Sequence, residues 1–388
     1  MDNFKFHAST EMLFGKDQIQ HLPEVLSRYG KRVLLAYGGG SIVRNGIYAA
    51  IKALLTDFTV IDFAGIEPNP RISSVKRGVE LAKTHHVDVI LAVGGGSVID
   101  CTKVVGAGAY YAGDPWDLVM DPSKIDRVLP IVSVLTLAGT GSEMNRGAVI
   151  THEGLQLKKG TGGPNTIPKV SIVDPTYLFT LPAWQTAAGS ADIFSHLLEN
   201  YFKKTPDAFV QDRVAEGLMQ TVIHYAPIAL EHPTDYSARA NLAYASSLAL
   251  NGMTGAGKGG AWSVHAIEHE LSAYYDLTHG IGLAILTLPW MRHILNADTV
   301  DKFVEYAVNV WKITPSGDKF ATAKAGIDAT EAFFKRLNIP LTLKDVAIDD
   351  SKFEVMAQRA VQLGNLEKSY VPLSVDDVMS ILRACQGE

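Results

Sequence analysis

The first half of the chain alternates short apolar runs with amphipathic stretches. The runs at 31–37, 58–63, 88–94 and 129–135 have the composition of buried strands, and the segments between them show helical periodicity. This alternation is typical of a parallel sheet covered by helices on both faces. An open sheet of this kind binds ligands beyond the carboxyl ends of its strands. We therefore expect a ligand-binding α/β domain.

The pattern changes after Val173-Asp174-Pro175. From Pro182 onward only helical periodicity remains, and helix-ending signals interrupt it at 204–206, 232–233, 252–260 and 338–340. A length of 388 residues suggests about two domains. We predict an α/β domain over residues 1–178 and an all-helical domain over residues 179–388.

Composition excludes several classes of function. The net charge of −6 comes without any basic block, so nucleic acid and anionic membranes are poor partners. Cys101 and Cys385 match no CxxC pattern, which fits a reducing compartment. The N-terminus lacks the pattern of a secretory signal, and the apolar run at 281–290 is too short to span a bilayer. We expect a cytoplasmic protein.

One window concentrates histidine. Residues 262–282, WSVHAIEHELSAYYDLTHGIG, contain His265, His269 and His279 among apolar residues. His265 and His269 are four apart and would share one face of a helix. Each imidazole could bond a backbone carbonyl, but a cluster of three on an apolar helix is also well satisfied by a metal ion.

A second segment offers a partner for that cluster. Asp192 and His196 are also four apart, and Glu199 follows one turn later. An Asp-x-x-x-His pair is commonly no more than a helical hydrogen bond. Set against the histidine window, however, it completes a ligand set of one carboxylate and several imidazoles, which suits Fe²⁺ or Zn²⁺ better than Mg²⁺ or Ca²⁺.

Two strand–GGGS–helix units stand at 38–41 and 94–97. A tight turn between strand and helix needs one glycine, whereas three in succession let backbone amides approach a phosphate at a helix N-terminus. Neither unit matches the G-x-G-x-x-G or the P-loop pattern. The segment 136–145 adds hydroxyls and amides at a third strand end, as expected around a ribose and a carboxamide.

Together these motifs resemble the iron-containing alcohol dehydrogenase family. The residues are GGGSVIDCTK at 94–103, AGTGSE at 138–143, the block at 173–200 and HAIEHELSAYYDLTHG at 265–280. The likeness is greatest to the butanol dehydrogenase and broad aldehyde reductase branch. It implies a Rossmann-like N-terminal domain and a helical C-terminal domain, a dehydroquinate synthase-like architecture, with nicotinamide and metal in the cleft between them.

The resemblance also implies residue roles. The metal ligands are Asp192, His196, His265 and His279, and His269 becomes a catalytic proton-relay candidate, a distinction that spacing alone does not make. Four protein ligands leave open whether the metal is catalytic, with a fifth position for substrate, or structural. The implied cofactor contacts are Gly38, Gly39 and Ser41 in the first loop, Gly95, Gly96 and Ser97 at the pyrophosphate, Thr136, Thr140 and Asn145 along the nucleotide, and Asp100, Lys158 and Tyr177 near the nicotinamide ribose.

The first glycine loop bears on the choice of cofactor. Relatives that prefer NAD carry an aspartate there, and a carboxylate would repel a 2′-phosphate. This chain reads Tyr37-Gly38-Gly39-Gly40-Ser41 with Arg44 nearby. We therefore expect NADP(H) rather than NAD.

The expected reaction is reversible hydride transfer between NADPH and a short-chain aldehyde such as butanal, in a homodimer. Trp262 and Tyr275 suggest an apolar pocket. A glycerol-type polyol dehydrogenase is the alternative. A dehydroquinate synthase-like enzyme would need several cations for its anionic substrate, whereas 255–280 holds only Lys258. The intact ligand set argues against a non-catalytic nucleotide-binding protein.

Overall fold

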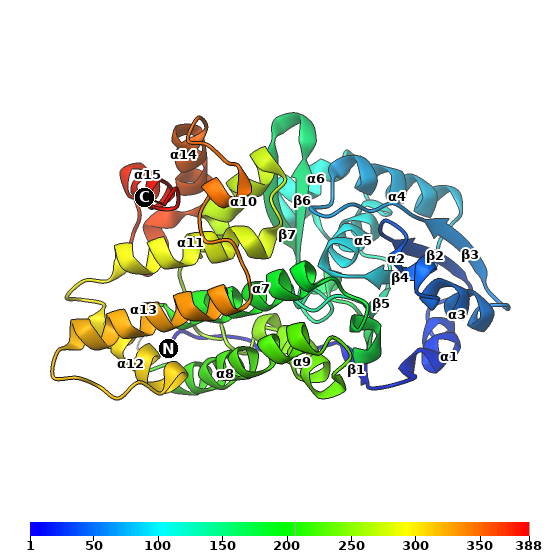
Figure 1. Ribbon diagram of the computed structural model, residues 1–388. Helices are drawn as coiled ribbons and strands as arrows, with labels where there is room; N and C mark the ends of the chain where they lie inside the picture. The colour runs from blue at the N-terminus through cyan, green and yellow to red at the C-terminus, as the bar shows by residue number, and fades with distance from the viewer. Residues whose placement is uncertain (206, 388) are drawn as a thin grey trace. The chain divides into compact units, whose positions relative to one another are not determined.

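The computed structural model describes residues 1–205 and 207–387; Pro206, part of one predicted helix-ending signal, lies outside this range, as does the last residue. The chain packs into two compact units (Figure 1). The α/β unit contains His7–Leu181 and Pro233–Asn251. The helical unit contains Met1–Phe6, Pro182–His232 and Gly252–Glu388.

These units differ in two segments from the division expected at 178/179. The first six residues pack with the helical unit, and residues 233–251 pack with the α/β unit. The second exchange has a clear cause in polar contacts. Ser246 Oγ accepts the Gly139 N–H at 2.9 Å, and Ser247 Oγ donates to the buried Glu143 carboxylate at 2.5 Å.

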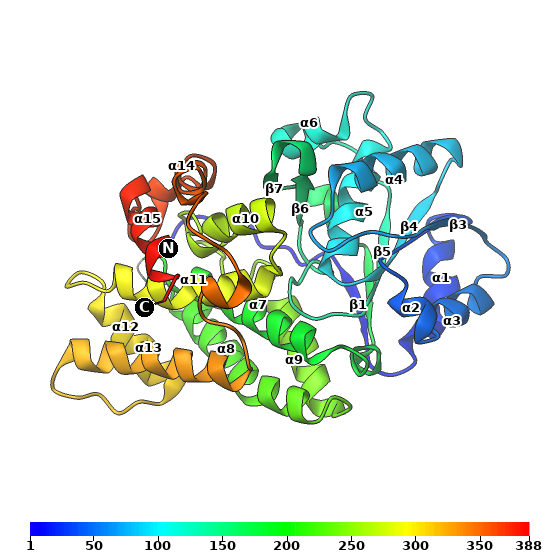
Figure 2. The same ribbon diagram turned by 45° about the horizontal axis from the view of Figure 1, so that its top comes forward.

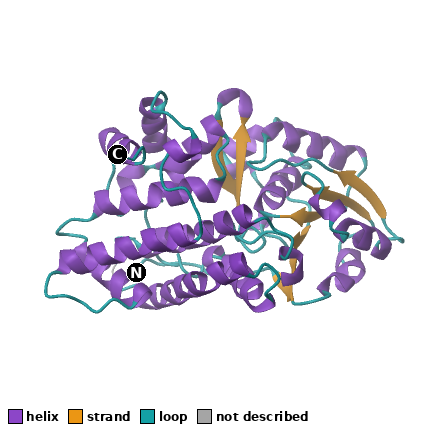
Figure 3. Cartoon of the chain, viewed as in Figure 1, coloured by secondary structure: helices purple, strands orange, loops and turns teal. Residues whose placement is uncertain are grey.

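A six-stranded, all-parallel sheet forms the centre of the α/β unit, in the order β1-β8-β5-β4-β2-β3. Figure 3 shows that the strands are confined to this unit. The strands of the sheet are β1 (Glu11–Phe14), β2 (Arg32–Tyr37), β3 (Thr59–Phe63), β4 (Val89–Gly94), β5 (Ile131–Leu135) and β8 (Val170–Val173). An antiparallel hairpin of β6 (Gly147–His152) and β7 (Leu157–Gly162) forms a separate sheet.

Apolar side chains on both faces of the sheet bury it between two layers of helices. In β2, Leu34 and Ala36 pack with α4 and α5, while Val33 and Leu35 pack with α1 and α3, because successive side chains of a strand point to opposite faces. Figure 2 shows these two helical layers. The helices of this unit are α1 (Leu22–Ser27), α2 (Ser41–Arg44), α3 (Ile47–Leu54), α4 (Ile72–Thr84), α5 (Gly96–Gly108), α6 (Pro115–Met120) and α9 (Tyr236–Leu250), with 3₁₀ turns η1 (Gln18–His21), η2 (Pro122–Lys124), η3 (Glu153–Leu155), η4 (Pro164–Thr166) and η5 (Pro175–Leu178).

The helical unit contains no strand among its described residues. Its helices are α7 (Ala183–Tyr201), α8 (Phe209–Glu231), α10 (Val264–Tyr275), α11 (His279–Ile294), α12 (Val300–Trp311), α13 (Lys319–Arg336), α14 (Phe353–Gly364) and α15 (Val375–Ala384), with 3₁₀ turns η6 (Lys344–Val346) and η7 (Leu366–Lys368). Across the described chain, no helix combines the length and apolarity that a membrane crossing requires.

The predicted parallel α/β fold followed by helices is thus observed, with local additions. The sequence did not reveal β1 and β8, which have four residues each, or the β6–β7 hairpin. The single amphipathic stretch expected after Ser41 is two helices, because Gly46 has a left-handed backbone with φ of 86° between them.

Candidate active site

Helix α7 supplies the first two candidate ligands. Asp192 and His196 are both 4% exposed and lie one turn apart. The helix is buried on several sides, since its own residues Ile193 and Leu197 are also buried. The Asp192 Oδ1 atom lies 3.3 Å from the His196 Nε2 atom. The predicted pair therefore exists as one face of a buried helix.

Helices α10 and α11 bring in His265 and His279. Helix α10 ends at Tyr275, because Asp276 adopts a left-handed conformation with φ of 51°, and α11 begins at His279 itself. The next residue, Gly280, packs directly on α7. A Cβ atom there would lie 1.9 Å from the Ala188 carbonyl oxygen, so only glycine allows this approach.

The three imidazoles converge on one oxygen of Asp192. Asp192 Oδ1 lies 3.9 Å from His265 Nε2 and 3.7 Å from His279 Nε2, besides its 3.3 Å to His196. The ligand atoms of Asp192, His265 and His279 all lie within 4.8 Å of one another. Ligands 2.1 Å from a tetrahedral metal would be about 3.4 Å apart.

Buried atoms without partners show that the residues fit a metal. Asp192 Oδ1 and His265 Nε2 have no hydrogen-bond partner among residues 1–205 and 207–387. A buried polar atom left in that state is costly, and a cation between the carboxylate and the imidazoles would satisfy both. Burial lowers the pKa of His196 to about 4, against the opposing charge of Asp192, so this ring is neutral at neutral pH, as a metal ligand must be.

Two further carboxylates orient two of the rings. Glu199 Oε2 lies 2.5 Å from His265 Nδ1, and the same carboxylate accepts the Val264 and His265 backbone N–H groups at 2.9 Å each. Burial opposes ionisation of Glu199, but its hydrogen bonds to His265 leave its pKa below the usual value. Glu268, which is fully buried, contacts His279 Nδ1 in the same way. Such carboxylates hold an imidazole with Nε2 directed at a metal.

His269 lies beside this cluster rather than in it. Its ring centroid is 5.8 Å from that of His279, and it groups with Glu268 and His279 on the more exposed side. His269 thus lies outside the group of ligand atoms around Asp192, although its own group, which shares His279, also has the spacing of a metal site, and its role stays a prediction.

The glycine loops lie at one edge of the sheet in the α/β unit. Gly38, Gly39 and Ser41 follow β2, Gly95–Ser97 follow β4, Thr136 and Thr140 follow β5, and Tyr177 follows β8. These strands are parallel neighbours, so their carboxyl ends meet at that edge.

The loops after β4 and β5 touch. Thr136 donates its N–H to the Gly94 carbonyl at 3.0 Å, and a Cβ on Gly96 would lie 2.2 Å from Thr140 Oγ1. Helix α5 therefore starts at a turn that packs tightly against the Thr140 side chain. Its first turn has no acidic residue and no side-chain cap, which leaves its N–H groups suited to a phosphate.

Asp100 and Asn145 are engaged inside the protein. Asp100 accepts from Ser142 Oγ at 2.5 Å and from the Val149 N–H at 2.8 Å. Asn145 Oδ1 accepts from the buried Lys103 at 3.2 Å and from the Gly147 N–H at 2.8 Å. These contacts fix the shape of the loop after β5. Lys158 is buried on β7, opposite Thr151 of β6, in the separate hairpin.

Comparison with known proteins identifies the family of this chain. A family model described as iron-containing alcohol dehydrogenase matches residues 9–175, and one described as Fe-containing alcohol dehydrogenase family, C-terminal, matches residues 186–386. The chain belongs to the iron-containing alcohol dehydrogenase family.

Individual relatives of this iron-containing alcohol dehydrogenase agree with the family model. The chain is 50% identical over 386 residues to NADH-dependent butanol dehydrogenase A of Clostridium acetobutylicum, covering 99% of each chain. It is 39% identical over 367 residues to the NADPH-dependent aldehyde reductase YqhD of Escherichia coli, covering 94% of each. The crystal structure of an NADH-dependent butanol dehydrogenase A from Thermotoga maritima matches with a TM-score of 0.94 at 38% identity, covering 100% of this chain and 99% of that one.

The predicted family, fold class and alcohol dehydrogenase or aldehyde reductase activity are therefore confirmed. Membership implies a nicotinamide cofactor and iron, while the relatives include both NADH- and NADPH-dependent enzymes.

Sequence reasoning missed some residues of this iron-containing alcohol dehydrogenase site. Glu268 was not identified, and its contact with His279 depends on the turn between α10 and α11, which no spacing rule reveals. Lys103 closes the GGGSVIDCTK motif but received no role. Burial raises the pKa of Tyr275, and its place in an apolar pocket stays a prediction.

Proposed function

We propose that this chain reduces short-chain aldehydes such as butanal, reversibly, with NADPH, at a divalent metal bound by Asp192, His196, His265 and His279. The observation that carries the proposal is the convergence of three Nε2 atoms on one buried Asp192 oxygen that has no hydrogen-bond partner among the described residues. Four candidate ligands and two orienting carboxylates are more buried polar groups than the packing of these helices requires.

The metal would be Fe²⁺ or Zn²⁺, because one oxygen and three nitrogens suit these ions. When bound, it supplies Lewis-acid polarisation of the substrate carbonyl. Asp192 contributes the negative charge that offsets part of the cation's charge, and Glu199 and Glu268 hold two imidazoles in the binding orientation. His279 is the most exposed of the four, with 23% of its side chain accessible. The side of His279 is therefore the side from which substrate approaches.

The nucleotide would lie along the carboxyl edge of the sheet. The backbone amides of Gly95, Gly96 and Ser97 would hold the pyrophosphate at the start of α5, and Thr136 and Thr140 would line the nucleotide. The bound cofactor supplies the hydride. We assign Asp100 and Asn145 to loop positioning, because their polar atoms already bond Ser142, Lys103 and backbone groups.

Preference for NADPH rests on the loop after β2. Gly39 is exposed, and no atom lies within 4 Å of a Cβ built on it. Arg44 Nη1 lies 3.5 Å from the Gly39 carbonyl oxygen, which places a guanidinium at the same loop. A positive group with open space and no carboxylate favours a 2′-phosphate.

His269 is the proposed proton-transfer residue. It lies next to His279 and is partly accessible, so it can exchange a proton with solvent while remaining close to the reacting oxygen. His265, one turn earlier on the same helix, has both ring nitrogens committed, Nδ1 to Glu199 and Nε2 to the proposed metal. We also propose a homodimer, which size-exclusion chromatography with light scattering tests.

A substrate panel tests the proposal. We expect kcat/KM with butanal and NADPH to exceed that with NADH, and butanol oxidation to exceed glycerol oxidation with one cofactor at one pH. An apolar chain gains about 0.8 kcal/mol per buried methylene, whereas a buried hydroxyl without a partner costs about 1–3 kcal/mol. Comparable rates for glycerol and butanol would instead support the polyol dehydrogenase alternative.

A further inference from the structure

The four candidate ligands are not held alike. Glu199 fixes the ring of His265, and Glu268 fixes that of His279, each through Nδ1. His196 Nδ1, by contrast, has no hydrogen-bond partner within the described part of the chain. A ring without a bond at Nδ1 can rotate about its χ2 torsion unless packing prevents it.

Packing on His196 comes from two aromatic rings. His265 stacks on it with ring centroids 4.8 Å apart and planes at 19°. The Trp262 indole lies 5.7 Å from His196 and 4.7 Å from His265, so it contacts both imidazoles. Trp262 thus occupies the structural role that a carboxylate has for the other two histidines.

Trp262 itself lies at the end of a segment without regular secondary structure. Residues 251–263 connect α9 to α10 through turns, bends and irregular backbone. A segment of this kind keeps one conformation only if side chains anchor it.

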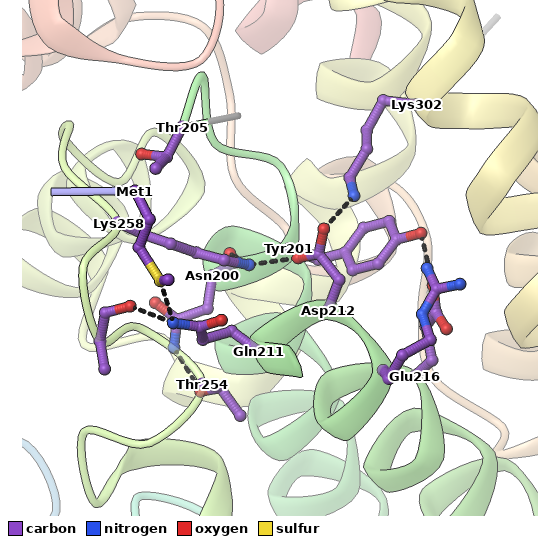
Figure 4. A network of polar contacts seen from close by, with 12 residues as sticks. Met1, Asn200, Tyr201, Thr205, Gln211, Asp212, Glu216, Thr254, Lys258 and Lys302 are labelled. Carbon is purple, nitrogen blue, oxygen red and sulfur yellow. Dashed lines mark hydrogen bonds and ion pairs between the residues drawn. The ribbon is translucent and has the colours of Figure 1, made fainter. Parts of the chain in front are cut away.

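The anchors come from the end of α7, from Lys203 just after it, and from α8. Lys203 Nζ donates to the Gly260 and Ala261 carbonyls at 2.8 Å each, directly before Trp262. Earlier in the segment, Thr254 Oγ1 accepts a hydrogen bond from Asn200 Nδ2 at 2.9 Å. Lys258 donates to the Asn200 carbonyl and to the Asp212 carboxylate. Figure 4 shows this part of the network.

Lys203 is an unusual anchor because it is 8% exposed. Burial lowers its pKa to about 8, against the opposing charge of Glu199. A buried ammonium is unfavourable unless its donors are satisfied, and here two backbone carbonyls accept them. The two hydrogen bonds offset part of the cost of burying this charge, and they fix the two peptide groups that lead into Trp262.

We propose that Trp262 is a positioning residue that orients the His196 imidazole, and that Lys203 holds Trp262 in place. This inference rests on the proposed role of His196 as a metal ligand. The carboxylates Glu199 and Glu268 and the indole of Trp262 then form one set, in which each candidate imidazole ligand has its own orienting group.

Zn²⁺ affinity of metal-free protein, measured by competition with a chromophoric chelator, tests the proposal without reference to activity. Trp262→Leu and Lys203→Met should each lower Zn²⁺ affinity on the order of 10-fold, the loss typical of removing a group that orients a metal ligand. Trp262→Phe, which keeps an aromatic ring, should stay close to the wild type. Lys204→Met is the matched control, since Lys204 is the exposed neighbour of Lys203.

Three outcomes decide the matter. Wild-type Zn²⁺ affinity in Trp262→Leu would overturn the role of Trp262. If Lys203→Met has the Zn²⁺ affinity and the tryptophan near-UV dichroism of the wild type, whatever its Tm, the role of Lys203 is overturned. If Lys203→Met does not fold, Lys203→Gln is measured in its place. Asp192→Ala with wild-type affinity would instead refute the metal site itself, so the two failures are distinguishable.

Discussion

Replacing Gly280 by alanine tests how closely helices α7 and α11 must approach to form the candidate metal site. The added Cβ atom would lie 1.9 Å from the Ala188 carbonyl oxygen, whereas real Cβ contacts stay at 3.0 Å or more. The added Cβ atom is fixed to the α11 backbone and meets backbone atoms of Ala188 on α7, so no flexible side chain can move to relieve the clash. The two helices must therefore separate by about 1 Å.

The separation has two consequences of different size. Overpacking of this kind costs about 1–3 kcal/mol, and we expect the upper end because rigid backbone is involved. A displacement of about 1 Å also exceeds the tolerance of about 0.2 Å for metal–ligand distances. Since His279 is the residue next to Gly280, Zn²⁺ or Fe²⁺ affinity should fall by at least about 10-fold.

The assay compares metal-free stability and metal affinity in the same preparation. Gly217→Ala on α8 is the matched control, because Gly217 is an exposed helical glycine with no atom within 4 Å of the built Cβ. That control should be neutral or more stable by roughly 0.5–1 kcal/mol. Unchanged stability and metal affinity in Gly280→Ala would refute the close approach of the two helices.

Three other predictions concern separate parts of the chain. His269→Ala should keep its metal, shown by elemental analysis, while kcat falls by roughly 10²–10⁴ because proton transfer is lost; loss of metal would instead make His269 a ligand. Gly39→Asp should shift kcat/KM from NADPH towards NADH, since the site is open enough for a carboxylate that repels the 2′-phosphate; a wild type that already prefers NADH would contradict the premise. Glu270, 3.0 Å from Arg359, has a pKa raised by burial to about 7, so its contribution to stability is present at low pH and is lost as pH rises from about 4 to about 7. In urea unfolding of the metal-free protein, Glu270→Gln should therefore lose less stability than the wild type between about pH 4 and about pH 7, by up to about 3 kcal/mol. A pH profile of stability equal to that of the wild type would disprove the pKa shift.

The fold was predictable where its signals were long or repeated. The buried strands β2, β4 and β5 carry runs of apolar residues, and the glycine units after β2 and β4 punctuate them clearly. Strands β1 and β8 were not predictable, because four residues are too few to show the alternating pattern that distinguishes a strand from a coil. Their place in the sheet is set by pairing with each other and with β5, which is a tertiary property.

The candidate site was predictable in its residue types rather than in its geometry. Helical spacing paired Asp192 with His196, but it also paired His265 with His269. Only the resemblance to a family separated His269 from the ligands, because His265 and His269 lie on one face of α10 and their distances to α7 depend on tertiary packing. Glu268 escaped prediction because its contact with His279 depends on the left-handed turn at Asp276 between α10 and α11.

The most direct test of the account is reconstitution of activity with metal. Protein stripped of metal by a chelator is titrated anaerobically with Fe²⁺, and butanal-dependent loss of the NADPH absorbance is recorded at each step. The account predicts no activity before addition, a linear rise that ends at one Fe²⁺ per chain in the wild type, and no such rise in Asp192→Ala. Butanal reduction by the stripped wild-type protein, or an equal rise in Asp192→Ala, would contradict it.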